Sequence, residues 1–378
     1  MRTELIRAVE LNHEATLARL GRALSDGALV VFPTETVYGV AAAATQPAAV
    51  ARLRALKNRG PNEPFTVHVG TPRAARRFLS QPSLLMRRLV RKAWPGPLTL
   101  ACSEKQVEQT SAGALLTPEG RSAVFGAGEV SIRCPDHSAA AALLGAVETP
   151  VVATAAGGAA DPPPLDVQDA LRVLDGQVEF AIDGGRTRFQ EGSTIVFVNG
   201  SRWTLRRAGV LSERTVRRLA TTEVLFVCTG NSCRSPLAEY LFRHKLAAAL
   251  GLSVPELAAA GYVVSSAGVA AGEGGGASRG TADELARRGI DASGHHSQPL
   301  TVELIQRAER IYCMTNEHLS AVLDLAPSAS SKATVLDPDG PVPDPIGGGP
   351  DEYRHCAEQI ERMIDIRISE LLDEDRNW

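Results

Sequence analysis

A short stretch in the second half of the chain constrains the fold most. Four consecutive apolar residues, 224–227, predict a buried strand, and Cys228 follows directly at its end. Six residues further on begins Arg234-Ser235-Pro236, in which Ser235 is a suitable N-cap and Pro236 a suitable first residue of a helix. The stretch therefore predicts a strand, a tight loop and a helix, with a cysteine and an arginine facing the same loop.

Such a loop is suited to binding an anion. Its backbone N–H groups converge, and the helix N-terminus adds positive potential that also favours the thiolate form of a cysteine. Arg234 can hold two oxygens of a phosphoryl group, and Ser235 can donate a hydrogen bond to the sulfur when it leaves. We therefore expect attack of Cys228 on phosphorus and a cysteinyl-phosphate intermediate. A buried structural cysteine beside an ordinary helix cap is the alternative, and it requires these features to coincide by chance.

This stretch resembles the low-molecular-weight protein tyrosine phosphatases and their arginine-phosphatase relatives. The resemblance rests on the Cys-x5-Arg-Ser motif with Gly230 and Asn231 inside it. It implies that Cys228, Arg234 and Ser235 are catalytic. It also implies that the other loop residues support the phosphate and determine substrate specificity: Thr229, Gly230, Asn231, Ser232 and Cys233.

Phosphoryl transfer from an oxygen or nitrogen leaving group also needs a proton donor. The segment between the last predicted strand and the last predicted helix holds the aspartates Asp337, Asp339, Asp344 and Asp351. We select Asp344, because it lies in the rigid turn 343–348 and because the family's general acid stands in a matching Asp-Pro motif. The same carboxylate would later activate the water that hydrolyses the intermediate. The alternative is that this segment of Asp, Pro and Gly is only a loop.

Two features favour phosphoarginine over phosphotyrosine as the substrate. Tyrosine-directed relatives commonly carry a branched apolar residue at the position of Ser232, and arginine-directed relatives carry threonine. The turn at 344–348 resembles the Asp-Pro-Phe-Gly-Gly turn of the arginine phosphatases, although Ile346 can still pack against a phenyl ring. Cys233 either forms a reversible disulfide with Cys228 or simply packs.

The remaining composition indicates a two-domain protein without a membrane segment. The chain has 378 residues and a net charge of −3, and no apolar run approaches membrane-spanning length. The scattered cysteines and the missing signal-peptide pattern predict a cytoplasmic location. No metal site is expected, since the neighbouring His295 and His296 have no third ligand at the usual spacing.

The two halves of the chain predict two different α/β sheets. In the second half, strands and helices alternate, which predicts a doubly wound parallel sheet with Cys228 at the carboxyl end of its first strand. In the first half, strands outnumber helices and several look antiparallel, which predicts a mixed, twisted sheet. Its predicted strands are 28–32, 65–69, 98–101, 130–134, 151–153, 179–182, 193–198 and 203–206.

An ordered set of motifs in the first half resembles the YrdC-type threonylcarbamoyl-AMP synthases over about residues 10–212. The motifs are Pro33-Thr-Glu-Thr-Val-Tyr-Gly39, Lys57-x-Arg59, Trp94-Pro-Gly-Pro-Leu-Thr-Leu100, Arg133-x-Pro135, Ser193-Thr-Ile-Val196 and Arg207-Ala-Gly209. The resemblance implies a reaction of threonine, bicarbonate and ATP with Mg²⁺, which feeds the N6-threonylcarbamoyladenosine modification of tRNA. It also implies tRNA, double-stranded RNA or tRNA-modification proteins as partners.

The same resemblance assigns two groups of residues to the two sides of one site. On the threonine side are Thr34, Thr36, His68, Arg133 and Ser193. On the nucleotide side are Lys57, Arg59, Thr154 and Arg207. Cations and hydroxyls of this kind suit a triphosphate and a small polar ligand, although each residue taken singly is also compatible with an ordinary surface charge or a satisfied buried polar group.

One motif departs from the synthase pattern. At 154–156 the family usually has Ser-x-Asn, whereas this chain has Thr154 and Ala156, and an alanine cannot replace the hydrogen bonds of an amide. Glu63 also stands where the family often has Asn. Two hypotheses follow: two active enzymes, or an active phosphatase fused to a catalytically degenerate nucleotide- or RNA-binding domain. A phosphate-binding sensor without catalysis is a third and weaker one. The predicted limits are 1–212 and 223–378, with a linker at 213–222.

Overall fold

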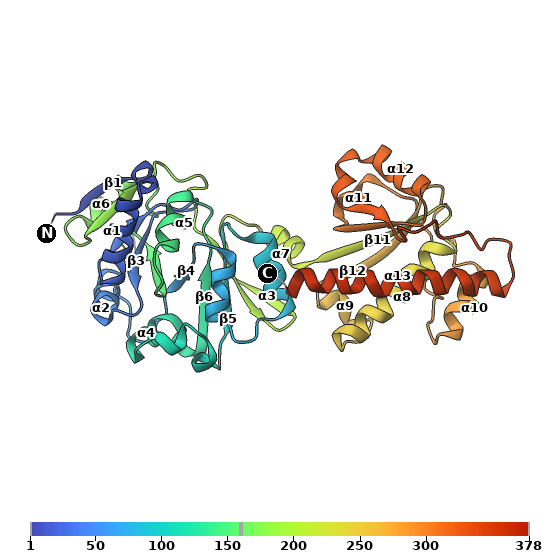
Figure 1. Ribbon diagram of the computed structural model, residues 1–378, viewed down its shortest axis with the longest axis horizontal. Coiled ribbons are helices and arrows are strands. Elements are labelled where there is room, and N and C mark those ends of the chain that lie inside the picture. Colours follow the sequence, from blue (N-terminus) through green and yellow to red (C-terminus); the bar gives the residue numbers. More distant parts are fainter. Residues whose placement is uncertain (1, 159–161, 377–378) are drawn as a thin grey trace. The chain divides into compact units, whose positions relative to one another are not determined.

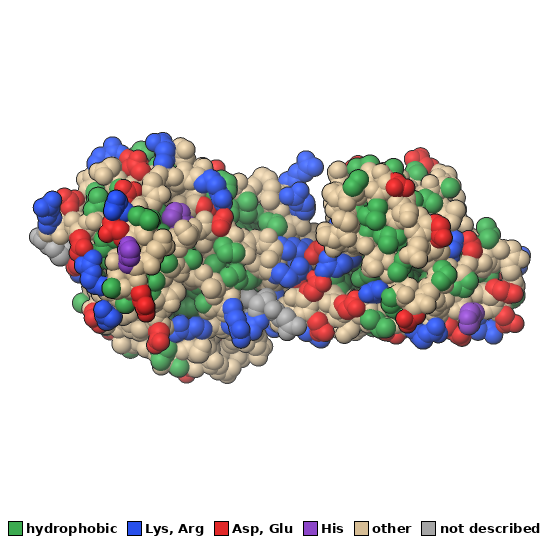
Figure 2. Space-filling model, turned by 45° about the horizontal axis from the view of Figure 1, so that its top comes forward, with side chains coloured by type: hydrophobic (Ala, Val, Ile, Leu, Met, Phe, Trp, Pro, Cys, Tyr) green, Lys and Arg blue, Asp and Glu red, His purple; other side chains and the backbone are tan. Residues whose placement is uncertain are grey.

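The computed structural model describes residues 2–158 and 162–376, which divide into two compact units (Figure 1). The first unit ends at Leu219 and the second begins at Ala220. The segment predicted as a linker, 213–222, contains helix α7 (Glu213–Ala220) and the first residue of strand β11 (Thr222–Cys228). On the face of each unit seen in Figure 2, acidic and basic side chains are interspersed, which agrees with the small net charge of the chain.

The first unit is built on a ten-stranded sheet with the order β1-β8-β2-β3-β7-β4-β6-β5-β9-β10. Parallel and antiparallel pairs both occur in it, which confirms the predicted mixed sheet. Its strands are β1 (Glu4–Arg7), β2 (Val30–Phe32), β3 (Gly39–Ala43), β4 (Thr66–His68), β5 (Leu98–Ser103), β6 (Glu129–Arg133), β7 (Val151–Ala155), β8 (Phe180–Asp183), β9 (Thr194–Asn199) and β10 (Arg202–Arg207).

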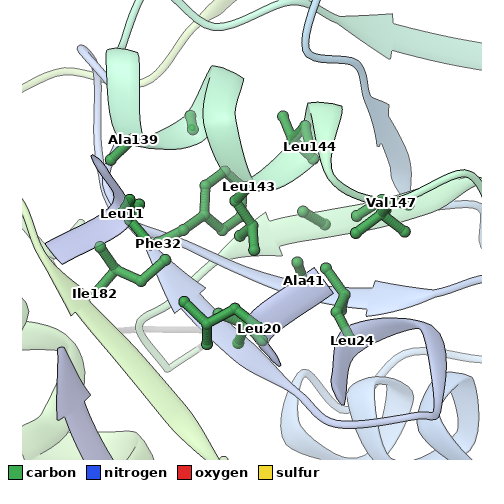
Figure 3. Close-up of a cluster of buried hydrophobic side chains, with 14 of the residues drawn as sticks. Leu11, Leu20, Leu24, Phe32, Ala41, Ala139, Leu143, Leu144, Val147 and Ile182 are labelled. Atoms are coloured by element: carbon green, nitrogen blue, oxygen red, sulfur yellow. The ribbon is translucent and has the colours of Figure 1, made fainter. Parts of the chain in front are cut away.

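Helices and strands of the first unit share a tightly packed core. Leu20 and Leu24 lie on one face of helix α1 because residues four apart in a helix point the same way, and they meet Leu143 of helix α5 and Phe32 of β2 (Figure 3). All four side chains are fully buried. The α-helices of this unit are α1 (Glu14–Ser25), α2 (Pro47–Leu56), α3 (Leu84–Ala93), α4 (Pro118–Phe125), α5 (Ser138–Gly145), α6 (Val167–Leu174) and α7.

The second unit is built on a parallel sheet of four strands with the order β12-β11-β13-β14, which confirms the predicted doubly wound fold. Helices α11 and α12 lie on one side of the sheet and helices α8 and α13 on the other (Figure 1). The strands are β11, β12 (Tyr262–Gly268), β13 (Arg310–Cys313) and β14 (Ala333–Val335). The helices are α8 (Arg234–Leu250), α9 (Glu256–Ala259), α10 (Arg279–Arg287), α11 (Val302–Arg307), α12 (Asn316–Leu325) and α13 (Pro350–Arg376).

This strand order fixes where a ligand would bind. The chain leaves β11 toward β12 on one side and then crosses to β13 on the other, so β11 lies at the topological switch point of the sheet. Ligands of open α/β sheets bind at such points, outside the carboxyl ends of the strands. Cys228 is the last residue of β11 and therefore stands at the expected place. None of the helices in 2–158 and 162–376 has an apolar stretch that would cross a bilayer.

The core of the first unit gives a test of the packing. Replacement of the fully buried Leu143 with alanine removes methyl groups that α1, α5 and β2 enclose, so we expect Leu143→Ala to lower the free energy of unfolding of this unit by about 2–5 kcal/mol. Leu115, which is 59% exposed, is the matched control, and Leu115→Ala should cost less than about 1 kcal/mol. Urea unfolding of the full chain measures both, and equal costs would contradict this core.

Candidate active sites

The loop between β11 and α8 surrounds the thiol of Cys228. Cys228 is 2% exposed, its Sγ lies 2.9 Å from Ser235 Oγ, and it accepts the backbone N–H of Asn231 at 3.3 Å. The predicted N-cap role of Ser235 is wrong, because α8 already begins at Arg234 and the residue at the N-cap is Cys233. The hydroxyl of Ser235 therefore faces the thiol instead of capping the helix, so two polar groups lie within hydrogen-bond distance of the sulfur.

A buried polar chain orients that hydroxyl. The amide nitrogen of Asn231 donates to Ser235 Oγ at 2.9 Å and to Ser266 Oγ at 2.7 Å, and the Ser266 hydroxyl donates to the buried carboxylate of Glu239. Because Ser235 already accepts from Asn231, its own hydrogen can point at Cys228. Asn231 has a φ of +52°, so the loop also depends on a backbone conformation that asparagine tolerates better than most residues.

Two further contacts hold the loop in place. Gln298 donates its backbone N–H to Asn231 Oδ1 at 2.9 Å, and the ring Nε2 of His295 lies 2.8 Å from the backbone oxygen of Asn231. Gly268 lies so close to the loop that a Cβ there would stand 2.5 Å from the backbone oxygen of Thr229. His295 lies in a loop as expected, yet it serves the phosphate loop. Sequence reasoning missed this role because 64 residues separate His295 from Asn231.

Arg234 meets the predicted acid directly. Its NH2 group donates to Asp344 Oδ2 at 2.5 Å and to Thr229 Oγ1 at 3.2 Å, and its NH1 group donates to the backbone oxygen of Val342 at 3.3 Å. Two of the alternative aspartates are engaged elsewhere: Asp337 with Gln359, and Asp351 with Arg354. The structure therefore brings Cys228, Arg234, Ser235 and Asp344 to one place.

The ion pair between Arg234 and Asp344 neutralises the buried positive charge of the site. The Arg234 side chain is 7% exposed and needs a charge partner, which the 38%-exposed carboxylate of Asp344 supplies. A guanidinium can also hold two oxygens of a phosphoryl group, so Arg234 is a candidate ligand for an anion in this loop.

The other predicted loop residues differ in their surroundings. The Cys233 thiol donates to Ser278 Oγ at 3.2 Å and lies 3.5 Å from the hydroxyl of Tyr353, and both cysteines of the loop are free thiols. The backbone oxygen of Ser232 accepts the N–H of Ser278 at 2.8 Å. Ile346 is 68% exposed and donates its backbone N–H to Asp344 Oδ1.

A second candidate site lies in the first unit, in a cavity of about 380 Å³. Residues from both predicted sides line it: Thr34, Arg59, His68, Arg133, Thr154, Ser193 and Arg207. Two predicted residues are not among its lining. Thr36 lies behind it, where its hydroxyl accepts from Arg133 at 2.6 Å, and the amino group of Lys57 donates to the backbone oxygen of Gly157.

The cavity is rich in positive charge. Arg133 donates to Glu35 at 3.0 Å in a buried ion pair, and its Nε is buried without a partner. Burial, then the charges of Arg133 and Arg59, lower the pKa of Arg207. Burial and the charge of Arg133 lower the pKa of His68 to about 3, so its ring is neutral. The three guanidinium groups that line the cavity, those of Arg59, Arg133 and Arg207, suit an anionic ligand.

Contacts across the cavity join residues that the sequence assigned to different sides. Ser193 Oγ lies 2.9 Å from Thr99 Oγ1 and accepts from Arg207 at 3.2 Å. Ala156, at the departure from the synthase pattern, is fully buried and donates its N–H to the backbone oxygen of Tyr38, whereas Thr154 lines the cavity. Sequence reasoning missed Glu35, Thr99 and Tyr38, although Glu35 and Tyr38 stand inside the quoted Pro33–Gly39 motif and Thr99 inside the quoted Trp94–Leu100 motif.

Within the described ranges no cluster of His, Cys, Asp and Glu side chains could hold a metal ion by itself. The carboxylate of Glu35 is engaged by Arg133 and by the backbone N–H of Asp136. Mg²⁺ tends to keep its waters and to be held by substrate phosphates. The hydroxyl of Thr154 is one of the protein oxygens that line the cavity.

Comparisons with known proteins divide the chain in the same way. A model for Sua5, YciO and YrdC proteins, described as "Telomere recombination", matches residues 22–209. A model described as "Low molecular weight phosphotyrosine protein phosphatase" matches residues 223–377.

Individual relatives agree with both matches. The chain is 33% identical over 194 residues to a Mycobacterium tuberculosis protein whose name assigns it to the threonylcarbamoyl-AMP synthases, covering 51% of this chain and 84% of that protein. It is 37% identical over 154 residues to the protein-arginine-phosphatase of Geobacillus stearothermophilus, covering 39% and 95%. A solved structure of a doubly substituted Sua5 from Pyrococcus abyssi matches with a TM-score of 0.50 and 25% identity, over 60% of this chain and 71% of that one.

The curated threonylcarbamoyl-AMP synthase of Pyrococcus abyssi is longer than the part it shares with this chain. The two are 31% identical over 174 residues, and this chain spans 48%, about half, of that protein. Together these matches confirm the predicted fusion of a Sua5/YrdC domain with a low-molecular-weight phosphatase domain. The chain belongs to the Sua5/YrdC family through its first unit and to the low-molecular-weight phosphatase family through its second.

Proposed function

We propose that the second unit is a cysteine-dependent protein phosphatase that prefers phosphoarginine. The first unit, in this proposal, makes threonylcarbamoyl-AMP from threonine, bicarbonate and ATP. The observation that carries the phosphatase is the meeting of Cys228 with Ser235 and of Arg234 with Asp344 at the carboxyl edge of one sheet. The relatives named protein-arginine-phosphatase and threonylcarbamoyl-AMP synthase support the two activities.

The first half of the phosphatase reaction follows from the geometry. A phosphoryl group enters the loop, takes both arms of Arg234 and releases Asp344. The Cys228 thiolate attacks phosphorus, and the bond from phosphorus to the leaving oxygen or nitrogen breaks. Asp344, which takes up a proton from solvent once it is released from Arg234, gives that proton to the leaving atom. The product is a cysteinyl-phosphate and an ionised Asp344.

The second half reverses the roles. The Asp344 carboxylate takes a proton from a water that attacks phosphorus, and the bond from sulfur to phosphorus breaks. The thiolate that leaves is stabilised by the hydroxyl of Ser235 and by the N–H of Asn231. Phosphate departs, Asp344 gives the proton that it took from water to solvent, and its carboxylate can pair again with Arg234.

The preference for phosphoarginine rests on the loop and on the acid turn. Ser232 is a small polar residue at the position where the resemblance places the specificity determinant. Ile346 lies beside the acid and is largely exposed, so it offers one apolar contact and no aromatic wall. Such a site gains little from stacking on a phenyl ring.

For the first unit, the proposal rests on the cavity. Arg59 and Arg207 face it on the nucleotide side, where they can neutralise phosphate oxygens, while Thr34 and Arg133 line its threonine side. ATP would bring Mg²⁺ as its counter-ion, and Thr154 would offer a hydroxyl to them. By the same resemblance we propose tRNA or tRNA-modification proteins as partners. The free cysteines support a cytoplasmic location.

Substitution of the nucleophile and of the acid tests the covalent mechanism. We expect Cys228→Ser to abolish turnover of a small aryl phosphate. We expect Asp344→Ala to slow substrates with poor leaving groups by about 10²–10⁴-fold and those with good leaving groups far less. Asp339→Ala, in an exposed position of the same segment, is the control and should behave as the wild type. Substantial turnover by Cys228→Ser, or equal losses for both leaving groups with Asp344→Ala, would contradict the assigned roles.

Substrate preference is tested with two peptides that differ only in the phosphorylated residue. We expect kcat/KM for the phosphoarginine peptide to exceed that for the phosphotyrosine peptide by about tenfold or more. Ser232→Ile, which introduces the branched apolar residue of tyrosine-directed relatives, should narrow or reverse this ratio. Ser232→Thr is the matched control and should preserve it. A wild-type preference for phosphotyrosine would rule out this assignment.

The synthase is tested by supplying the full chain with ATP, threonine, bicarbonate and Mg²⁺. We expect threonylcarbamoyl-AMP and pyrophosphate in equal amounts, measured by chromatography. Arg133→Ala removes a buried cation from the cavity and should lower the rate by about 100-fold or more. Arg73→Ala, at an exposed position, should not change it. Without product from the wild type, the first unit would instead be the degenerate nucleotide-binding domain.

A further inference from the structure

Helix α12 brings an unassigned histidine to the phosphate loop. Strands β11 and β13 are parallel neighbours, so the residues that follow them meet at the same edge of the sheet. Thr229 follows β11, and α12 begins shortly after β13 ends. His318, in the first turn of α12, is 5% exposed. Its Nε2 lies 2.9 Å from Thr229 Oγ1, and its Nδ1 lies 3.0 Å from Thr315 Oγ1.

These contacts form a hydrogen-bond chain from Thr315 through His318 and Thr229 to Arg234, and the contact with Arg234 fixes which groups in it donate. A guanidinium can only donate, so the oxygen of Thr229 accepts from Arg234 at 3.2 Å. The hydroxyl hydrogen of Thr229 is then available for Nε2 of His318, provided that the ring carries its proton on Nδ1 and donates it to Thr315. In this assignment Nδ1 donates and Nε2 accepts, which requires a neutral ring. Burial, and then the charge of Arg234, lower the pKa of His318 against the opposing carboxylates of Glu317 and Asp344.

This hydrogen-bond chain is important because Arg234 loses its contact with Asp344 in the proposed reaction. Its guanidinium has hydrogen-bond contacts with Asp344, Val342 and Thr229. In the proposed function Asp344 leaves when phosphate enters. The side-chain contact that stays is the one with Thr229, whose hydroxyl rotates freely unless something else holds it.

We propose that His318 is a positioning residue of the phosphatase, which holds Arg234 in its phosphate-binding orientation through the hydroxyl of Thr229. This inference rests on the proposed phosphatase activity and adds a residue to it. His318 touches neither the phosphate nor the thiol in this arrangement. It acts on the reaction only by fixing the orientation of Thr229.

A purely structural role of His318 would have different consequences. If the ring only fills space at the start of α12, its loss changes the stability of the unit and leaves the affinity for phosphate unchanged. If it orients Arg234, its loss weakens the binding of the phosphoryl oxygens and raises the barrier. The losses of activity caused by substitutions at His318 and Thr229 would then not add up, because both substitutions break the same hydrogen-bond chain.

The experiment measures kcat/KM for an aryl phosphate and the inhibition constant of inorganic phosphate on the full chain. We expect His318→Ala and Thr229→Val each to lower kcat/KM and to weaken phosphate inhibition by about tenfold. The double variant should also lose about tenfold, instead of the hundredfold of independent effects. His318→Gln, which keeps an acceptor for Thr229, should recover most of the loss. His355→Ala, at an exposed position of α13, is the control and should match the wild type.

Several outcomes would overturn the inference. Wild-type phosphate inhibition in His318→Ala would do so, as would multiplicative losses in the double variant. If His318→Ala does not fold, as judged by thermal unfolding, Thr229→Val and His318→Gln decide: unchanged phosphate inhibition in Thr229→Val overturns the proposal. A wild-type protein that hydrolyses no phosphorylated substrate would instead refute the proposed function itself, which separates the two failures.

Discussion

The geometry of the phosphatase site depends on how the side chain of Asn231 is held. Its amide bridges Ser235 and Ser266, and its backbone adopts a left-handed conformation that brings its N–H to the thiol of Cys228. Left-handed residues other than glycine carry a conformational cost, which persists only where the surroundings fix them. Here the buried carboxylate of Glu239 holds Ser266, so one chain of hydrogen bonds extends to the nucleophile. The loop is thus shaped before any phosphate arrives.

Both units pair a buried arginine with a carboxylate, but the two pairs differ in how firmly the carboxylate is held. Arg234 and Arg133 are each about nine-tenths or more buried, and an unpaired charge there would be costly. Glu35 is 2% exposed and also accepts from the backbone of Asp136, so it is fixed. Asp344 is 38% exposed and lies in a loop. In the proposed mechanism the Arg234–Asp344 pair can therefore exchange its carboxylate for a phosphate. The Arg133–Glu35 pair, in contrast, stays intact.

Much of this could be predicted from sequence, because the decisive signals were local. The apolar run before Cys228 marks a strand, and the motif of the loop places nucleophile, arginine and serine within eight residues. Strand β3 was not expected, since Gly39–Ala43 consists almost entirely of small residues that give a weak strand signal despite complete burial. The N-cap assignment of Ser235 failed because the loop uses that hydroxyl for the thiol.

What could not be predicted depends on contacts between distant parts of the chain. His318 stands 89 residues from Thr229, and Ser266 stands 27 residues from Glu239. No spacing rule connects such pairs, because the order of the strands in the sheet decides which loops meet. The selection of Asp344 among four aspartates rested on an Asp-Pro turn, and the ion pair of Asp344 with Arg234 could not be predicted from that turn.

In the proposed mechanism the phosphoryl group is bound covalently to Cys228 before water releases it. The most direct measurement is rapid quenching of the Asp344→Ala variant during turnover, followed by mass spectrometry of the peptide that contains Cys228. Without its carboxylate the variant hydrolyses the intermediate slowly, so the account predicts a phosphoryl group on the sulfur of Cys228. An unmodified Cys228 in a variant that still releases the first product would contradict it.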